Sequence, residues 1–142
     1  MTDKVRLAPA VAAAILVHAR AEAPLEACGI LSGPPSTNGD GGATRYHPAR
    51  NALASGTAYD VHPEDLVRIV HAIDAAGDAL VGVVHSHPRG PAIPSATDVR
   101  EARYAVPHLV VSLLDPTASP IEAIRAWRIG TAGAREAGLL IG

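Results

Sequence analysis

The 142-residue sequence predicts an α/β fold, in a single domain over residues 1–142. Helix-type and apolar strand-type segments alternate along the chain, an order that fits neither an all-helical nor an all-strand protein. Apolar residues make up 48% of the chain, which is enough to fill one core at this length. With one Trp, three Tyr and no Phe, that core must consist mainly of Ala, Val, Leu and Ile.

Three segments have the pattern of helices. Residues 9–23 are alanine-rich and apolar all round, which indicates a largely buried helix that begins at Pro9. Residues 62–77 have apolar side chains on one face, acidic residues in the first turn and a glycine at the end, as an amphipathic helix does. Residues 95–105 open with a serine that suits a helix N-cap.

Strands are predicted between and after these helices. Residues 28–33 form a glycine-bounded apolar run, and residues 79–87 form a longer one that is typical of a strand buried on both faces. The remaining predicted strands are residues 43–50, 57–61, 108–115 and 121–129, with a weak strand after them. Pro48 places the first of these at a sheet edge, because proline has no amide hydrogen for a ladder. Residues 34–42, rich in Pro and Gly, predict a loop.

Charge and cysteine content exclude several classes of protein. Twelve Lys and Arg residues against 14 Asp and Glu give a net charge of -2, so no nucleic-acid partner is expected. The apolar run 8–17 is too short to span a membrane and lacks a signal-peptide pattern, which predicts a cytoplasmic protein with no membrane partner. Cys28 is the single cysteine, so no internal disulfide or CxxC site exists. We expect it to be a buried strand residue rather than a nucleophile or ligand.

Polar side chains gather where the longest predicted strand ends. His85 and His87 lie two residues apart, so their imidazoles leave the same face of the strand. After a sharp loop, Asp98 follows Ser95 by three residues and returns a carboxylate to the same region. Two imidazoles and a carboxylate suit a catalytic zinc with an open position for water. The alternative is that Ser95 and Asp98 form only a capping box, which needs no metal.

Hydrolysis at such a metal requires a carboxylate base nearby. Glu26, just before the strand at 28–33, is one candidate, and the alternative for it is an exposed turn residue. Asp60, Glu64 and Asp65 compete, although the last two already suit a first helical turn. Spacing does not choose among them. The five other histidines are expected on the surface or on helix faces.

Together, Glu26, His85, His87, Ser95 and Asp98 resemble the motif of the JAMM or MPN-plus (Mov34/JAB) zinc metalloproteases. The resemblance runs from the first helix to the segment IRAWRI. It implies a curved mixed β-sheet flanked by helices, the JAMM/MPN (cytidine-deaminase-like) fold. It also implies that His85, His87 and Asp98 bind Zn²⁺, that Glu26 is the general acid/base, and that Ser95 helps to stabilise the oxyanion.

The compact chain is most similar to bacterial members, which include peptidases acting on ubiquitin-like sulfur-carrier proteins, such as the enzyme that releases cysteine from its carrier. The resemblance therefore implies a zinc metallopeptidase that cleaves a peptide or isopeptide bond after a carrier's C-terminal Gly-Gly. Polyubiquitin is not favoured, because the sequence has no long insertions. The alternatives are a non-catalytic MPN scaffold and a JAMM-type cell-wall or phage-tail peptidase. Arg89 and Arg103 are either solvated charges or groups that hold the carrier's terminal carboxylate.

Overall fold

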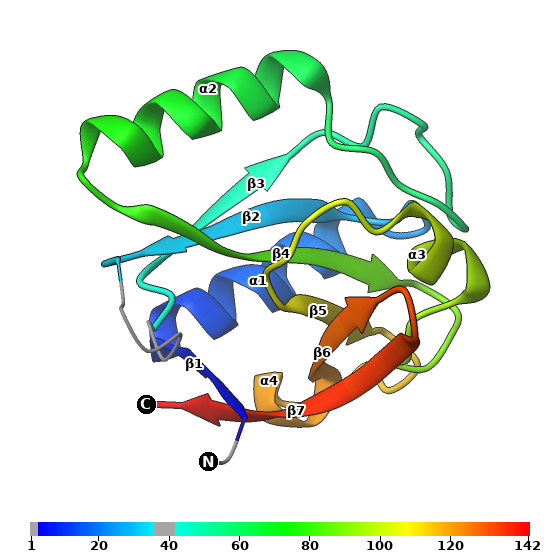
Figure 1. The fold of residues 1–142 in the computed structure, drawn as a ribbon. Coiled ribbons are helices and arrows are strands. Elements are labelled where there is room, and N and C mark those ends of the chain that lie inside the picture. The colour runs from blue at the N-terminus through cyan, green and yellow to red at the C-terminus, as the bar shows by residue number, and fades with distance from the viewer. Residues whose placement is uncertain (1–2, 36–41) are drawn as a thin grey trace.

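The computed structural model describes residues 3–35 and 42–142 and contains a mixed β-sheet with helices on both faces (Figure 1). The strands are β1 (Lys4–Leu7), β2 (Cys28–Gly33), β3 (Arg45–Ala49), β4 (Ala79–His87), β5 (His108–Ser112), β6 (Ile124–Gly130) and β7 (Gly133–Ile141). The helices are α1 (Pro9–Glu22), α2 (Pro63–Ala75), α3 (Ala96–Glu101) and α4 (Pro120–Ala123).

The sheet has seven strands in the order β1-β7-β6-β5-β4-β2-β3. β1 pairs with β7, and β4 with β5, in parallel, whereas the other neighbours are antiparallel. The prediction of a mixed α/β sheet flanked by helices is confirmed. β3 lies at an edge, as Pro48 required.

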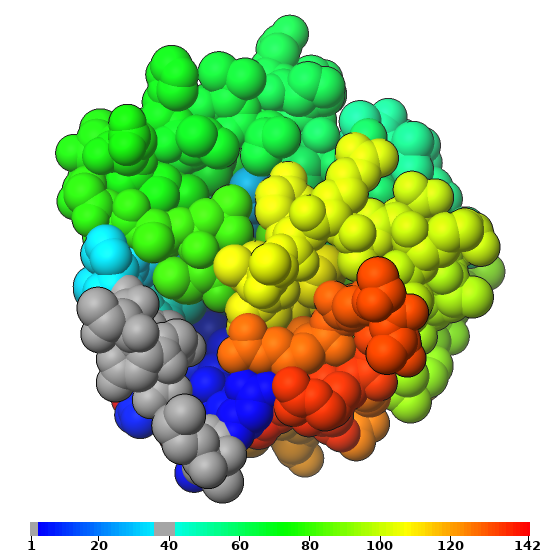
Figure 2. Space-filling model, in the orientation of Figure 1, coloured from blue at the N-terminus to red at the C-terminus, as the bar shows by residue number. Residues whose placement is uncertain are grey.

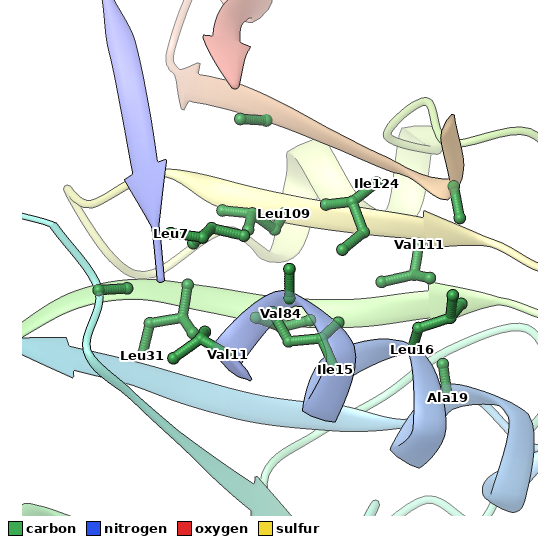
Figure 3. Packing of buried hydrophobic residues seen from close by; sticks show 14 of the residues in the cluster. Leu7, Val11, Ile15, Leu16, Ala19, Leu31, Val84, Leu109, Val111 and Ile124 are labelled. Atoms are coloured by element: carbon green, nitrogen blue, oxygen red, sulfur yellow. The ribbon is translucent and has the colours of Figure 1, made fainter. Parts of the chain in front are cut away.

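Helix α1 covers one face of the sheet and forms the larger core with it (Figure 3). Ile15 and Leu16 of the helix pack with Val84 and Leu109, which point from the central strands β4 and β5. Leu109 is fully buried and Ile15 is 1% exposed. Each such side chain stabilises the fold by about 1.5–3 kcal/mol relative to an exposed position, and this core holds the central strands in place.

Helix α2 covers the opposite face. Because side chains alternate along β2, Leu31 belongs to the core beneath α1, while Cys28 and Ile30 pack with Ile69 and Ile73 of α2. Over residues 3–35 and 42–142, no helix combines the length and apolarity needed to cross a membrane.

Two predicted elements near the site differ from the structure. Residues 57–61 form no strand, because the Asn51 side chain binds backbone groups of this segment that a ladder would use; only a single bridge joins Asn51 to Val61. The predicted helix 95–105 is limited to α3. The chain leaves the helix at Ala102, whose backbone is extended (φ -63°, ψ 124°), and leads back to β5 through Pro107.

Two further differences lie far from the site. The predicted strand 121–129 begins with the short helix α4, which a capping box between Ser119 and Glu122 starts. β1 was not predicted, because its four residues are stabilised by β7, which comes from the other end of the chain. The predicted loop over 34–42 falls mostly on residues 36–41, which lie outside the described residues.

Candidate metal centre

The C-terminal end of β4 supplies two imidazoles to one face of the sheet. His85 lies opposite Cys28 of β2 and Val110 of β5 in the central part of the sheet, and it is 1% exposed. His87 lies at the open end of the strand and is partly exposed. The two rings meet edge to face at 5.1 Å, as expected from their spacing.

Asp98, in the first turn of α3, brings a carboxylate to these rings. Its Oδ2 lies 3.0 Å from Nε2 of His85 and 3.0 Å from Nε2 of His87. The same oxygen accepts a hydrogen bond from the Ser95 amide at 2.8 Å, and Ser95 Oγ accepts one from the Asp98 amide at 3.0 Å. The capping box is therefore present together with the cluster, and it fixes the direction of the carboxylate.

Glu26 completes a group of four side chains. A ligand atom from each of Glu26, His85, His87 and Asp98 lies within 4.8 Å of the others. Glu26 is 3% exposed, and its Oε1 has no hydrogen-bond partner in residues 3–35 and 42–142. Asp60, the competing carboxylate, is exposed and lies outside this group.

One side chain and one backbone carbonyl that the sequence did not single out hold the backbone around Glu26. Ser86 points away from the histidines, and its Oγ accepts from the Ala27 amide at 2.8 Å, while its own amide donates to the Ala27 carbonyl at 3.0 Å. The Glu26 amide donates to the Ser55 carbonyl at 2.8 Å. No spacing rule predicts these bonds, since they join segments far apart in the chain.

Asn51 organises the loop that covers His85. Its amide donates to the Glu26 carbonyl at 3.1 Å and to two carbonyls of the loop 53–60 at 3.3 and 3.0 Å. Its oxygen accepts from two amides of the same loop at 3.0 and 3.1 Å. The loop thereby places the Tyr59 ring in a stack on His85, with 4.5 Å between centroids and 18° between planes. Neither Asn51 nor Tyr59 was among the five residues that carry the resemblance, and no local pattern predicted these contacts.

The loop 88–94 orients His87. Nδ1 of His87 donates to the Pro91 carbonyl at 2.9 Å, which leaves Nε2 to face Asp98. Two strands hold the loop itself: Ser112 Oγ donates to one loop carbonyl at 2.8 Å and Trp127 Nε1 donates to another at 3.0 Å. The neighbouring strands thus determine which nitrogen of His87 points into the cluster.

Burial and hydrogen bonds set the protonation of the cluster. Burial raises the pKa of Glu26 to about 7, with a smaller opposing effect of His87. Burial also lowers the pKa of His85, which favours its neutral form. Although burial alone would raise the pKa of Asp98, hydrogen bonds from His85 and His87 hold it well below its usual value. For His87, burial opposes protonation, but Asp98 and the Pro91 carbonyl raise the pKa.

This donor set fits a metal ion. Two imidazole nitrogens and a carboxylate oxygen converge, and a cation would replace the protons that now lie between Asp98 and the rings. The unpartnered Glu26 Oε1 is a further buried polar atom that needs a partner such as water or an ion. The residues present therefore suit a metal bound by nitrogen and oxygen.

Other residues differ in part from expectation. Cys28 is fully buried in β2, and burial raises the pKa of its thiol to about 12, as a structural cysteine requires. The expectation that the remaining histidines lie on the surface or on helix faces is wrong for two of them. His47 is buried and bonded to Ser32 Oγ at 2.7 Å, and His108 is 2% exposed with its Nε2 bonded to a backbone carbonyl.

Comparison with known proteins identifies the family. A family profile described as prokaryotic homologs of the JAB domain matches residues 8–130. A desampylase from Haloferax volcanii is 42% identical over 95 residues, which cover 63% of this chain and 66% of that protein. A CysO-cysteine peptidase from Mycobacterium tuberculosis is 35% identical over 113 residues, which cover 79% of this chain and 75% of that protein.

A solved structure agrees with these matches. The solution structure of a protein from Desulfitobacterium hafniense superposes with a TM-score of 0.87 at 28% identity, over 97% of this chain and 92% of that one. The match spans just under two thirds of the desampylase's length. The fold, the cluster and the profile agree: the chain belongs to the prokaryotic homologues of the JAB domain.

Proposed function

We propose that this chain is a zinc-dependent metallopeptidase that hydrolyses the peptide or isopeptide bond after the C-terminal Gly-Gly of a ubiquitin-like sulfur-carrier protein. Glu26 carries the proposal: a buried carboxylate with an unpartnered oxygen lies beside three converging donor atoms. A carboxylate in this position suits proton transfer to and from a water molecule. The substrate class is supported by the relatives, a desampylase and a CysO-cysteine peptidase.

The proposed roles follow from the donor atoms. His85, His87 and Asp98 would hold the zinc ion, which when bound lowers the pKa of water and polarises the scissile carbonyl. Glu26 accepts a proton from the attacking water at Oε1 and passes it to the leaving nitrogen. With a pKa of about 7, this carboxyl both accepts and donates a proton near neutral pH.

Ser95 is proposed to stabilise the negative charge that develops on the carbonyl oxygen. Its Oγ accepts a hydrogen bond from the Asp98 amide, so the hydroxyl hydrogen is free to donate elsewhere. The side chain is exposed next to the cluster, where a substrate carbonyl can reach it. A donor of this kind contributes about 10²–10³-fold to the rate in other acyl-transfer sites.

Metal content and turnover test these roles separately. Purified wild type is expected to hold about one zinc per chain, and the double variant His85→Ala, His87→Ala is expected to lose most of it. Glu26→Gln is expected to keep the metal and lose at least about a hundredfold in turnover. Glu64→Gln, which changes an exposed glutamate on α2, is the matched control and should retain both. Wild type that takes up no zinc, or Glu26→Gln with normal turnover, would contradict the assignment.

The substrate is tested by mass spectrometry. A small β-grasp carrier extended past its Gly-Gly by one amino acid or a short peptide is expected to be cut after the second glycine, while linked diubiquitin is cut poorly. A diglycine tail has no side chains, so it fits beside the zinc and binds through its main chain. If wild type leaves such carriers intact but cleaves diubiquitin or a peptidoglycan stem peptide, the sulfur-carrier assignment is wrong.

A further inference from the structure

A cavity of about 350 Å³ adjoins the metal cluster. It lies between the loop 53–61 and α2 on one side and α3 with the segment leading to β5 on the other. These segments lie side by side on one face of the molecule, where the yellow residues before β5 meet the green residues of α2 (Figure 2). The cavity is on the α2 side of the sheet, the side to which the metal-facing histidines point.

The cavity begins at the cluster itself. Asp98 lines it, and so does Tyr59, whose ring stacks on His85. Leu66, Tyr59 and Tyr104 contribute apolar surface to its walls. Its volume falls within the range of sites that enclose small ligands, roughly 300–1,000 Å³. A diglycine tail has no side chain to fill such a space, so the cavity suits the group on the other side of the scissile bond.

One basic side chain at this cavity has no charged partner among the described residues. Arg103 lines the cavity and is exposed, and in residues 3–35 and 42–142 no carboxylate lies within 4.0 Å of its guanidinium. Arg100, three residues earlier, differs: it pairs with Glu101 at 3.8 Å and lies outside the lining. For His108, the other basic residue of the lining, burial lowers the pKa, which favours the neutral form.

The lining also contains the carboxylates of Asp60 and Glu101. The net charge of the cavity therefore does not attract an anion by itself. Recognition of a carboxylate here therefore depends on hydrogen bonds of defined geometry. The planar guanidinium of Arg103 offers two parallel N–H groups that match the two oxygens of a carboxylate.

We propose that this cavity receives the leaving group and that Arg103 binds the leaving group's free α-carboxylate. The preferred substrate then carries one amino acid or a very short peptide beyond the Gly-Gly, not a second folded protein. This inference rests on the proposed function. In the reaction the bond between the glycine carbonyl carbon and the leaving nitrogen breaks, and water supplies the oxygen of the new carboxylate and the two protons that convert the leaving nitrogen into an ammonium group. Arg103 takes no part in that exchange and acts only in binding.

Paired substrates test the inference. A β-grasp carrier is extended past its Gly-Gly by one or two alanines, each ending either in a carboxylate or in a carboxamide. Each residue moves the terminus by about 3.5 Å, so the two lengths sample different reaches toward Arg103. Wild type is expected to cleave the carboxylate form at least about tenfold faster in kcat/KM at one of the lengths, the scale of a charge-assisted pair.

Two variants identify the residue responsible. Arg103→Gln is expected to reduce the ratio of carboxylate to carboxamide rates to near one, and Arg103→Lys to give an intermediate ratio. Arg100→Gln is the matched control and should keep the wild-type ratio. The same preference should appear in dissociation constants measured with the Glu26→Gln protein, which report binding without turnover.

The outcomes separate the two proposals. Equal wild-type rates for carboxylate and carboxamide at both lengths, or a ratio that persists in Arg103→Gln, would overturn the inference and leave the proposed function standing. Failure of wild type to cleave any extended carrier would overturn the proposed function itself.

Discussion

Replacing Glu26 by glutamine in the metal-free protein is expected to stabilise the fold while it removes the proposed base. The Glu26 carboxyl is buried, and burial raises its pKa from 4.5 to about 7. A carboxyl with a raised pKa binds its proton more tightly in the folded chain than in the unfolded chain. The stability of the protein therefore falls as the pH rises from about 4.5 through about 7.

The size of this effect follows from the same shift. One unit of pKa difference corresponds to about 1.4 kcal/mol, so the ionised carboxylate costs at most about 3.5 kcal/mol of unfolding free energy well above pH 7. At pH 5 the folded group is protonated and the cost is about 1 kcal/mol. Glutamine has a similar shape but does not ionise, so the stability of Glu26→Gln relative to wild type should increase by about 2.5 kcal/mol between pH 5 and pH 8.

Urea denaturation of chelator-treated wild type and Glu26→Gln at pH 5 and pH 8 measures this difference. Glu64→Gln, at an exposed position on α2, serves as the control and should show no such increase. The reasoning is refuted if the advantage of Glu26→Gln over wild type is the same at both pH values, or if the variant is the less stable protein at pH 8.

Further substitutions test other features. Asp65→Asn should lower the free energy of unfolding at pH 7 by about 1–3 kcal/mol, because the Asp65 carboxylate accepts hydrogen bonds from the side chain and amide of Arg50. These bonds lower the pKa of Asp65, so their contribution to stability is present above about pH 4 and declines as the pH falls. If urea denaturation shows the same stability difference between wild type and Asp65→Asn at pH 2 as at pH 7, this explanation is wrong. Trp127→Phe removes a hydrogen bond to the loop that orients His87 and should weaken zinc binding about tenfold in competition with a chromogenic chelator, whereas wild-type affinity would exclude this role. Leu109→Ala, at a fully buried position in the central strand β5, should cost about 3 kcal/mol in thermal or urea unfolding, and a loss under 1 kcal/mol would mean that the core repacks.

Local patterns predicted the strand that carries the two histidines and the helix that covers the same face of the sheet. The apolar run at residues 79–84 of β4 and the amphipathic pattern of α2 were sufficient to find both elements, and the two-residue spacing put His85 and His87 on one face. The capping box of α4 was also visible as Ser119 and Glu122, but the alternation of the following residues led to a strand prediction over all of 121–129. Where a short helix runs directly into a strand, the helix-capping pattern and the strand-type alternation favour different elements for the same residues.

The remaining contacts of the site depend on tertiary structure. The bond of Ser86 to Ala27 and the stack of Tyr59 on His85 join segments that are distant in sequence. In the sequence Asn51 has the pattern of an ordinary loop residue, and only the structure shows that its side chain binds the backbone carbonyls of Glu26 and Ala58. β1 was missed for the same reason, since four alternating residues become a strand only beside β7.

The pairing of β1 with β7 brings the two ends of the described chain to the same edge of the sheet, away from α3 and the metal centre (Figure 1). Leu7 lies beside Ile141, and the Gly142 amide donates to the Leu7 carbonyl at 3.0 Å. From Asp3 to Leu7 the chain extends about 13 Å, so a linker of about five residues joins the ends. A circular permutant opened in the exposed turn 131–132 would keep every strand neighbour, and an affinity tag or surface tether at either end would leave the face with the candidate metal centre uncovered.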